Sequence, residues 1–156
     1  MKILSGLFIG LFLFCAGPIQ GRAQTHDSLK YHIAVFLPLY LDSAFDASGN
    51  YRYDQSFPKF LNPGLEFYEG IELAMDSLRK KGTSLEITVY DTRSTKKSIQ
   101  QMMEEPAFSN MQLILGYVNA GDLRILANVA RNMEIPFINV NFPNDGGVTG
   151  NPEFVI

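Results

Sequence analysis

The residue types that most often perform chemistry are few in this chain. There are two histidines, His26 and His32, and neither has a partner at a metal-binding spacing. The single cysteine, Cys15, lies in an apolar run near the start, so the rest of the chain has no thiol for a disulfide, a zinc site or a nucleophile. Neither a glycine-rich phosphate loop nor a Gly-x-Ser-x-Gly turn occurs. We therefore expect no cofactor and no metal ion.

Carboxylates are the remaining candidates for catalysis, because Asp91 and Asp145 follow expected strands. Catalytic carboxylates occur at such positions, but an aspartate there more often caps a helix or forms a turn. We predict that the protein is not an enzyme, with an exported hydrolase that uses Asp91 or Asp145 as an alternative. The net charge of −3 provides no basic surface for nucleic acid.

The first thirty residues are expected to lie outside the folded part. A short positive start precedes an apolar run over residues 3–16, which is too short to span a membrane. Small residues flank a cut after Ala23, which predicts a secretory signal over residues 1–23, followed by a flexible stretch over residues 24–30. Export to the periplasm follows. Lipid attachment through Cys15 is not expected, because a bulky phenylalanine precedes it.

Strand and helix patterns alternate over the rest of the chain. Apolar segments predict strands over residues 31–37, 85–90, 113–115 and 135–140, and a fifth strand begins at residue 154. A first helix is expected to start at Asn62 as its N-cap, and a second to lie within residues 94–105. The first helix has the apolar stripe Phe67, Ile71, Ala74 and Leu78, and a third has Leu123, Leu126, Ala127 and Ala130. This alternation predicts an α/β fold with a doubly wound parallel sheet.

Open parallel sheets bind ligands at the carboxyl ends of their strands. Those ends are the segments that follow Leu37, Tyr90, Leu115 and Val140. The candidate ligand-binding residues in these segments are Tyr40, Asp91, Thr92, Tyr117, Asn119, Asn141 and Phe142. Asn119 has a second interpretation, as the N-cap of the helix that follows it.

A long loop over residues 39–61 contains six aromatic residues. Loops of this length inside compact domains are often lids or binding segments. We expect this loop to be ordered, with its rings either covering a ligand or a partner, or packing over the end of the sheet as a local core.

Several short motifs occur in a specific order after the predicted signal. They are Ile33-Ala34-Val35-Phe36-Leu37-Pro38-Leu39, Gly70-Ile71-Glu72-Leu73-Ala74, Val89-Tyr90-Asp91, Leu113-Ile114-Leu115-Gly116, Ile135-Pro136-Phe137-Ile138-Asn139 and Asn151-Pro152-Glu153-Phe154. This order resembles the N-terminal lobe of the type 1 periplasmic binding proteins, in particular the substrate-binding components of amino-acid ABC transporters. The resemblance covers residues 31–156 and implies one flavodoxin-like lobe with the strand order 2-1-3-4-5.

The resemblance implies a solute-binding component of an ABC-type uptake system, whose partner is a permease in the inner membrane. The solute would be an amino acid or a similar small polar molecule. The family's Gly-Pro-x-x-Ser turn is replaced here by Gly116-Tyr117-Val118-Asn119, and its small hydroxyl residues after the fourth strand by Asn141-Phe142, which weakens the case for an α-amino acid.

Type 1 binding proteins trap their ligand between two lobes, in a chain more than twice as long as this one. We therefore expect the chain to be a fragment or truncated form that lacks the second lobe and binds weakly or not at all. The alternative is an envelope interaction or regulatory module of the same fold, with no transport role.

Overall fold

A computed structural model describes residues 30–54, 56–143, 146–149 and 154–156. The predicted signal over residues 1–23, most of the stretch 24–30, His26, Cys15, Asp145 and the predicted lead into a fifth strand at 151–153 lie outside the described residues. Within the described ranges, no helix combines the length and apolar character needed to cross a membrane.

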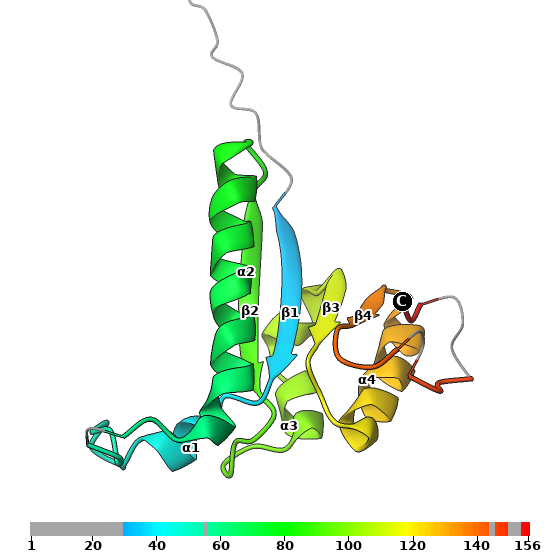
Figure 1. The fold of residues 1–156 in the computed structure, drawn as a ribbon. Helices are drawn as coiled ribbons and strands as arrows, with labels where there is room; N and C mark the ends of the chain where they lie inside the picture. The colour runs from blue at the N-terminus through cyan, green and yellow to red at the C-terminus, as the bar shows by residue number, and fades with distance from the viewer. Residues whose placement is uncertain (1–29, 55, 144–145, 150–153) are drawn as a thin grey trace, which may run out of the picture.

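Four parallel strands form one sheet in the order β2-β1-β3-β4 (Figure 1). The strands are β1 (Tyr31–Leu37), β2 (Leu85–Asp91), β3 (Leu113–Gly116) and β4 (Phe137–Asn139). The expected α/β class with a parallel sheet is confirmed, and β1 is a central strand, as its continuous apolar run indicates. Beyond β4, a single parallel bridge joins Phe137 to Val155.

Helices lie on both faces of the sheet (Figure 1). On one face lies α2 (Asn62–Lys80); the other carries α3 (Ile99–Met103), the 3-10 helix η2 (Pro106–Asn110) and α4 (Ala120–Met133). Successive residues of β1 serve opposite faces, because side chains alternate along a strand. Ala34 and Phe36 belong to the core under α3 and α4, whereas Val35 and Leu37 pack with Ile71 of α2.

The core under α3 and α4 is the larger of the two. The ring of Phe36 stacks on that of Tyr90 at a centroid distance of 4.8 Å. The ring of Phe108 meets both edge-on, at 6.0 and 5.9 Å. The predicted stripe of α4 is confirmed, since Leu123, Leu126, Ala127 and Ala130 are all buried. Packing of large rings and an apolar helix stripe fixes this half of the sheet rigidly.

The predicted buried stripe of α2 is correct only in its first half. Ile71 is buried and Phe67 is half-buried, but Ala74 and Leu78 are exposed. The residue that packs against the sheet after Ile71 is Met75, not Ala74. The reason is that contact with β1 and β2 continues along the i, i+4 row, where the long side chain of Met75 reaches the strands.

The start of α2 also differs from the prediction. The 3-10 helix η1 (Lys59–Leu61) runs directly into α2, so Asn62 already has helical backbone angles and Leu61 is the N-cap. Gly64 allows this end of α2 to approach β1 closely, since a Cβ there would lie 2.2 Å from the carbonyl oxygen of Pro38. That contact brings the start of α2 next to the carboxyl end of β1.

The predicted helix within residues 94–105 is shorter in the structure. It begins at the N-cap Ser98, which forms a capping box with Gln101, and α3 ends at Met103. Residues before Ser98 are held elsewhere: the Ser94 hydroxyl and the Thr95 amide donate to the carboxylate of Asp42, at 3.0 and 2.9 Å. This contact between distant segments keeps residues 94–97 out of the helix.

The long loop over residues 39–61 is ordered, as expected, apart from residue 55, which is not described. It contains α1 (Leu41–Ala44) and an antiparallel bridge between Phe45 and Tyr51. We call residues 41–60 the arm. This segment, which begins with α1, projects sideways from the sheet (Figure 1).

Candidate functional site

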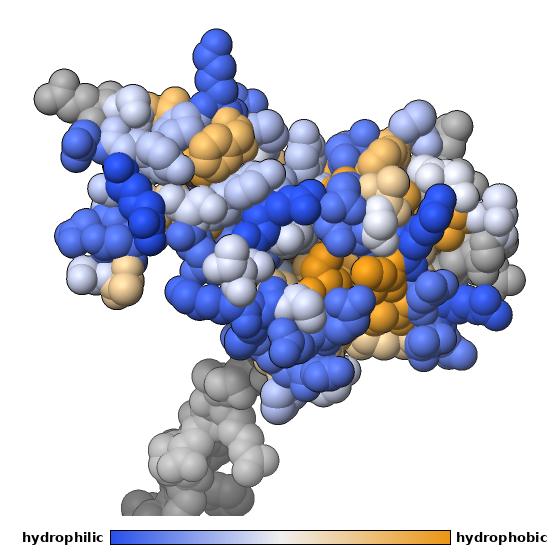
Figure 2. Space-filling model, turned by 90° about the horizontal axis from the view of Figure 1, so that it is seen from below, coloured by the Kyte–Doolittle hydropathy of each residue, from blue (hydrophilic) through white to orange (hydrophobic). Residues whose placement is uncertain are grey.

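A cleft of about 350 Å³ lies at the carboxyl edge of the sheet, where the segments after β1, β2, β3 and β4 meet. Figure 2 looks onto this edge and shows a mostly hydrophilic surface with several apolar areas, the most extensive of them in its right half. Five of the seven predicted ligand-binding residues line the cleft, namely Tyr40, Tyr117, Asn119, Asn141 and Phe142. The rule that ligand sites form at strand ends therefore locates most of the cleft.

Tyr40 forms one wall of the cleft together with Phe60 of the arm. Their rings meet edge-on at a centroid distance of 5.1 Å. The backbone of Tyr40 is left-handed, with φ of 55°, a conformation that costs a residue with a side chain about 1–2 kcal/mol. Surrounding contacts must hold it, and they do: the backbone amide of Tyr40 donates to the carboxylate of Asp91 at 3.1 Å.

Tyr117 and Asn119 form the opposite wall, directly after β3. The amide of Tyr117 donates to the carbonyl oxygen of Phe36 at 2.9 Å, which fixes the first residue after the strand. The side-chain oxygen of Asn119 accepts from the amide of Asp122 at 2.8 Å, which confirms Asn119 as the N-cap of α4. Its side-chain nitrogen has no hydrogen-bond partner among the described residues, so Asn119 can cap the helix and donate into the cleft.

Asn141 builds the cleft by joining two loops. Its side-chain nitrogen donates to the carbonyl oxygen of Val118 at 2.8 Å, and its side-chain oxygen accepts from the Val118 amide at 3.1 Å. Asn139 holds Phe142 in the same way. Its side-chain nitrogen donates to the carbonyl oxygen of Phe142, and its side-chain oxygen accepts from the Phe142 backbone amide. The side chain of Asn141 is thus already engaged, and its role is to hold the wall that Phe142 completes.

Asp91, a predicted ligand-binding residue, does not line the cleft. Its carboxylate accepts four backbone N–H groups, those of Leu39, Tyr40 and Arg93 at one oxygen and that of Leu41 at the other, at 2.8 to 3.1 Å. Those donors come from the turn after β1 and from its own turn. Because backbone amides occupy both of its oxygens, Asp91 acts on the cleft indirectly, by holding the backbone of Tyr40 in place.

Thr92 is also absent from the lining of the cleft. Its amide donates to the carbonyl oxygen of Leu37 at 3.0 Å, continuing the pairing of β2 with β1. Its hydroxyl oxygen is buried without a hydrogen-bond partner. The continued pairing sets Thr92 apart from the cleft, so the structure does not bring it together with the other predicted ligand-binding residues.

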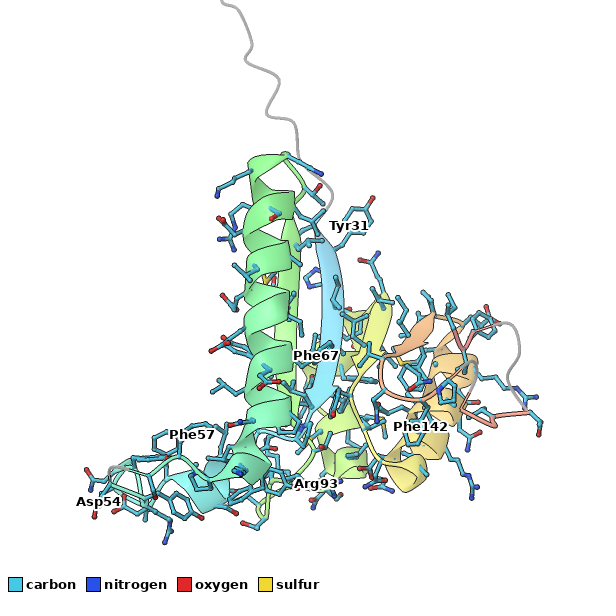
Figure 3. The ribbon with its side chains drawn as sticks, viewed as in Figure 1. Tyr31, Asp54, Phe57, Phe67, Arg93 and Phe142 are labelled. Carbon is cyan, nitrogen blue, oxygen red and sulfur yellow. The ribbon has the colours of Figure 1, made fainter. Side chains whose placement is uncertain are left out.

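Arg93 lines the cleft and was not among the predicted residues. Its Nε atom is buried and has no hydrogen-bond partner, and Arg93 forms no ion pair within the described part of the chain. Figure 3 shows Arg93 below the carboxyl end of β1, with Phe142 on the side of α4. Its position two residues after β2 was the available signal, since the strand-end segments include it.

A carboxylate near Arg93 belongs to Asp122, in the first turn of α4. Its Oδ2 atom is buried without a hydrogen-bond partner. Burial raises the pKa of Asp122, and the positive charge of Arg93 opposes that rise. Arg93 and Asp122 are both half-buried, each has one buried polar atom without a partner, and they form no ion pair among the described residues.

A second cavity, of about 590 Å³, lies between α3, η2 and α4. Apolar side chains dominate its lining, including Met103, Phe108, Val129 and Met133. It offers fewer groups that could orient a polar solute than the cleft, so we do not place a solute there. No cluster of three histidine, cysteine, aspartate or glutamate residues suited to a metal ion occurs in the described ranges.

Comparison with known proteins returns no match to a family model, a curated protein or a solved structure. The functional inference therefore depends on the cleft and on the motifs along the chain.

Proposed function

We propose that this chain is a solute-binding lobe of the type 1 periplasmic binding protein kind, serving an ABC-type uptake system. The observation that carries the proposal is the cleft at the carboxyl edge of the parallel sheet, lined by segments that follow all four strands. On this proposal the fold continues to the flavodoxin-like order 2-1-3-4-5, with Val155 marking the fifth strand. The partners are a small solute and an inner-membrane permease.

The chemistry of the cleft suits a small molecule with both polar and apolar parts. Tyr40, Tyr117 and Phe142 supply ring surface, and the side-chain nitrogen of Asn119 supplies a hydrogen-bond donor. Ligand pockets combine apolar walls with a few placed polar groups in this way. A volume of about 350 Å³ is near the lower end for such sites, which favours a solute of one ring or less.

The affinity of a single lobe is expected to be low. A micromolar site is worth about −8 kcal/mol, and half of those contacts would give about −4 kcal/mol, which corresponds to millimolar binding. The entropy cost of association does not halve with the contacts, so the remaining affinity could be weaker still.

A ligand screen with matched tyrosine variants tests the proposal. Amino acids, small carboxylates and sugars are added at millimolar concentration to the chain, and thermal stability is recorded. We expect one class to raise the melting temperature, and Tyr117→Ala to abolish the shift. Tyr31→Ala is the control, because Tyr31 is an exposed tyrosine at the amino end of β1, away from the cleft (Figure 3). Equal shifts in both variants would contradict the proposal, whereas silence throughout is the result expected of a lobe that binds too weakly alone.

The arm supports a second candidate, an envelope interaction module with no transport role. Phe45, Phe57 and Phe60 are 40%, 51% and 43% exposed, which is unusual for three phenylalanines within one short segment. A protein partner that covers these rings would explain their exposure. Silence in the solute screen, together with a partner whose binding is lost in Phe57→Ser, would favour this candidate over the first.

A further inference from the structure

Resting on the proposed function, we propose that the solute carries a carboxylate on a ring-sized apolar body, and that Arg93 selects it. The carboxylate would lie against the Arg93 guanidinium, and the apolar body against the rings of the cleft. Nothing in the motifs of the chain assigns a ligand group to Arg93.

First, Arg93 has hydrogen-bonding capacity that no described residue uses. A guanidinium carries five N–H donors in a planar fork and stays charged at every physiological pH. Its Nε atom is buried without a partner, and no carboxylate lies within 4.0 Å of its nitrogens among the described residues. Arg93 is half-buried and its Nε is shielded from water, so an anion that entered the cleft would pair with a partly desolvated charge and gain more here than at a fully exposed arginine.

The second argument is that neighbouring carboxylates do not take the place of this anion. Asp91 is next but one in sequence, but backbone amides occupy both of its oxygens. Asp122 is close enough to feel the charge of Arg93, yet its Oδ2 atom remains without a partner and it does not line the cleft. Burial raises the pKa of Asp122 and the charge of Arg93 opposes that rise, but the two groups are not within ion-pair distance.

The third argument is the apolar character of the surrounding walls. Tyr40, Phe60, Tyr117 and Phe142 all line the same cleft as Arg93. A bare inorganic anion would leave this ring surface uncovered, whereas an aromatic or branched apolar body would bury it. The planar fork of an arginine also matches the two oxygens of a carboxylate. A carboxylic acid with one ring fits the charge, the walls and the volume together.

Two acids and their neutral amides test the inference. The probes are 3-phenylpropionate with 3-phenylpropionamide, and L-phenylalanine with L-phenylalaninamide, so the two pairs distinguish a simple aromatic acid from an amino acid. Sodium acetate controls for ionic strength and for a carboxylate without a ring. Dissociation constants are measured by ligand-observed NMR for the wild-type chain, Arg93→Gln, Arg93→Lys and Arg124→Gln. Arg124→Gln is the matched control, because Arg124 is exposed on α4 and does not line the cleft.

We expect at least one acid to bind about tenfold or more tightly than its amide, as a charge-assisted hydrogen bond predicts. Arg93→Gln should remove that preference, Arg93→Lys should keep part of it, and Arg124→Gln should leave it intact. Circular dichroism should show Arg93→Gln folded, because the Nε of Arg93 bonds to no other described residue and its bond to Asp91 comes from the backbone amide, which the variant keeps.

Three results would overturn the inference: equal binding of acid and amide, an acid preference that survives in Arg93→Gln, or no binding of either acid. The first two leave the proposed function standing, because a solute still occupies the cleft. In the third case the wider screen decides, since a neutral sugar that depends on Tyr117 would keep the proposed function and remove only the carboxylate.

Discussion

Asp91 is the last residue of β2 and Arg93 follows it by two positions, yet the hydrogen bonding of their side chains differs. The carboxylate of Asp91 accepts four backbone N–H groups and faces away from the cleft. The guanidinium of Arg93 faces the cleft with a buried nitrogen that has no partner. Asp91 accepts the hydrogen bonds of the turn backbone, whereas Arg93 has an N–H group without an acceptor.

This difference separates residues that build the cleft from residues that can act in it. Asp91, Asn141 and Asp42 tie segments that are distant in the sequence, and each tie uses the whole polar side chain. Arg93 and the side-chain nitrogen of Asn119 are left for a ligand. If the separation is correct, changes in the first group should lower stability, and changes in Arg93 should lower binding while leaving stability nearly unchanged.

The largest loss of stability is expected for Asp91→Ala. Four backbone amides lose their acceptor, and Tyr40 loses the contact that holds its left-handed backbone, so we expect about 3 kcal/mol less free energy of unfolding. Urea denaturation measures the change. Asp76→Ala is the control, since Asp76 forms only an exposed pair with Lys80 and should cost about 0.5 kcal/mol or less. Similar losses in the two variants would break the comparison.

A smaller loss is expected for Asn141→Ala, on the other side of the cleft. The amide and the carbonyl of Val118 would both lose their partner, which predicts about 2 kcal/mol. Hydrogen exchange at the Val118 amide should accelerate together with the loss measured by urea. Asn128→Ala serves as the control, because Asn128 is exposed on α4. Unchanged exchange at Val118 would show that Asn141 does not hold this wall.

The third effect depends on pH and concerns Asp42. The ammonium of Lys96, the Thr95 amide and the Ser94 hydroxyl hold the pKa of Asp42 well below its usual range. A carboxyl whose pKa is depressed by folding stabilises the fold above its unfolded pKa, and that stabilisation is lost as the pH falls below about 4.

Asp42→Asn should therefore lower the melting temperature at neutral pH, by less than the first two variants because the site is close to solvent. The difference from the wild type should shrink as the pH falls from about 4, since the wild-type carboxylate then becomes protonated. Lys96→Gln, which removes the largest cause of the shift, should reproduce part of the effect. A difference that stays constant down to pH 2 would contradict the assignment.

The parts of the fold that follow from local pattern could be predicted from the sequence. The continuous apolar run of β1 and the stripe of α4 have single interpretations, and both are correct in the structure. The start of α3 could not be predicted, because Asp42 holds Ser94 and Thr95 from more than fifty positions away. The buried face of α2 could not be predicted for a similar reason. Whether Met75 or Ala74 packs against the sheet depends on the strands beneath the helix.

The candidate site shows the same limit. That strand ends converge follows from a parallel sheet, so the sequence could bring together five residues that line one cleft, namely Tyr40, Tyr117, Asn119, Asn141 and Phe142. Whether a polar side chain at a strand end faces the ligand or the backbone depends on donors from other loops. Asp91 was assigned to the cleft and Arg93 was overlooked for that reason, because no spacing along the chain shows which carboxylate meets the amides of residues 39–41.

The most direct test of the account is to map the binding site of the strongest compound from the solute screen by amide chemical shifts of the isotope-labelled chain. We predict that the amide signals of Tyr117, Val118 and Asn119 shift during the titration. Those of Met103, Val129 and Met133, which line the second cavity between α3, η2 and α4, should not shift. Two results would contradict the claim that the cleft is the solute site. One is a shift of the signals from the second cavity with unchanged signals from the cleft; the other is that no compound shifts either set.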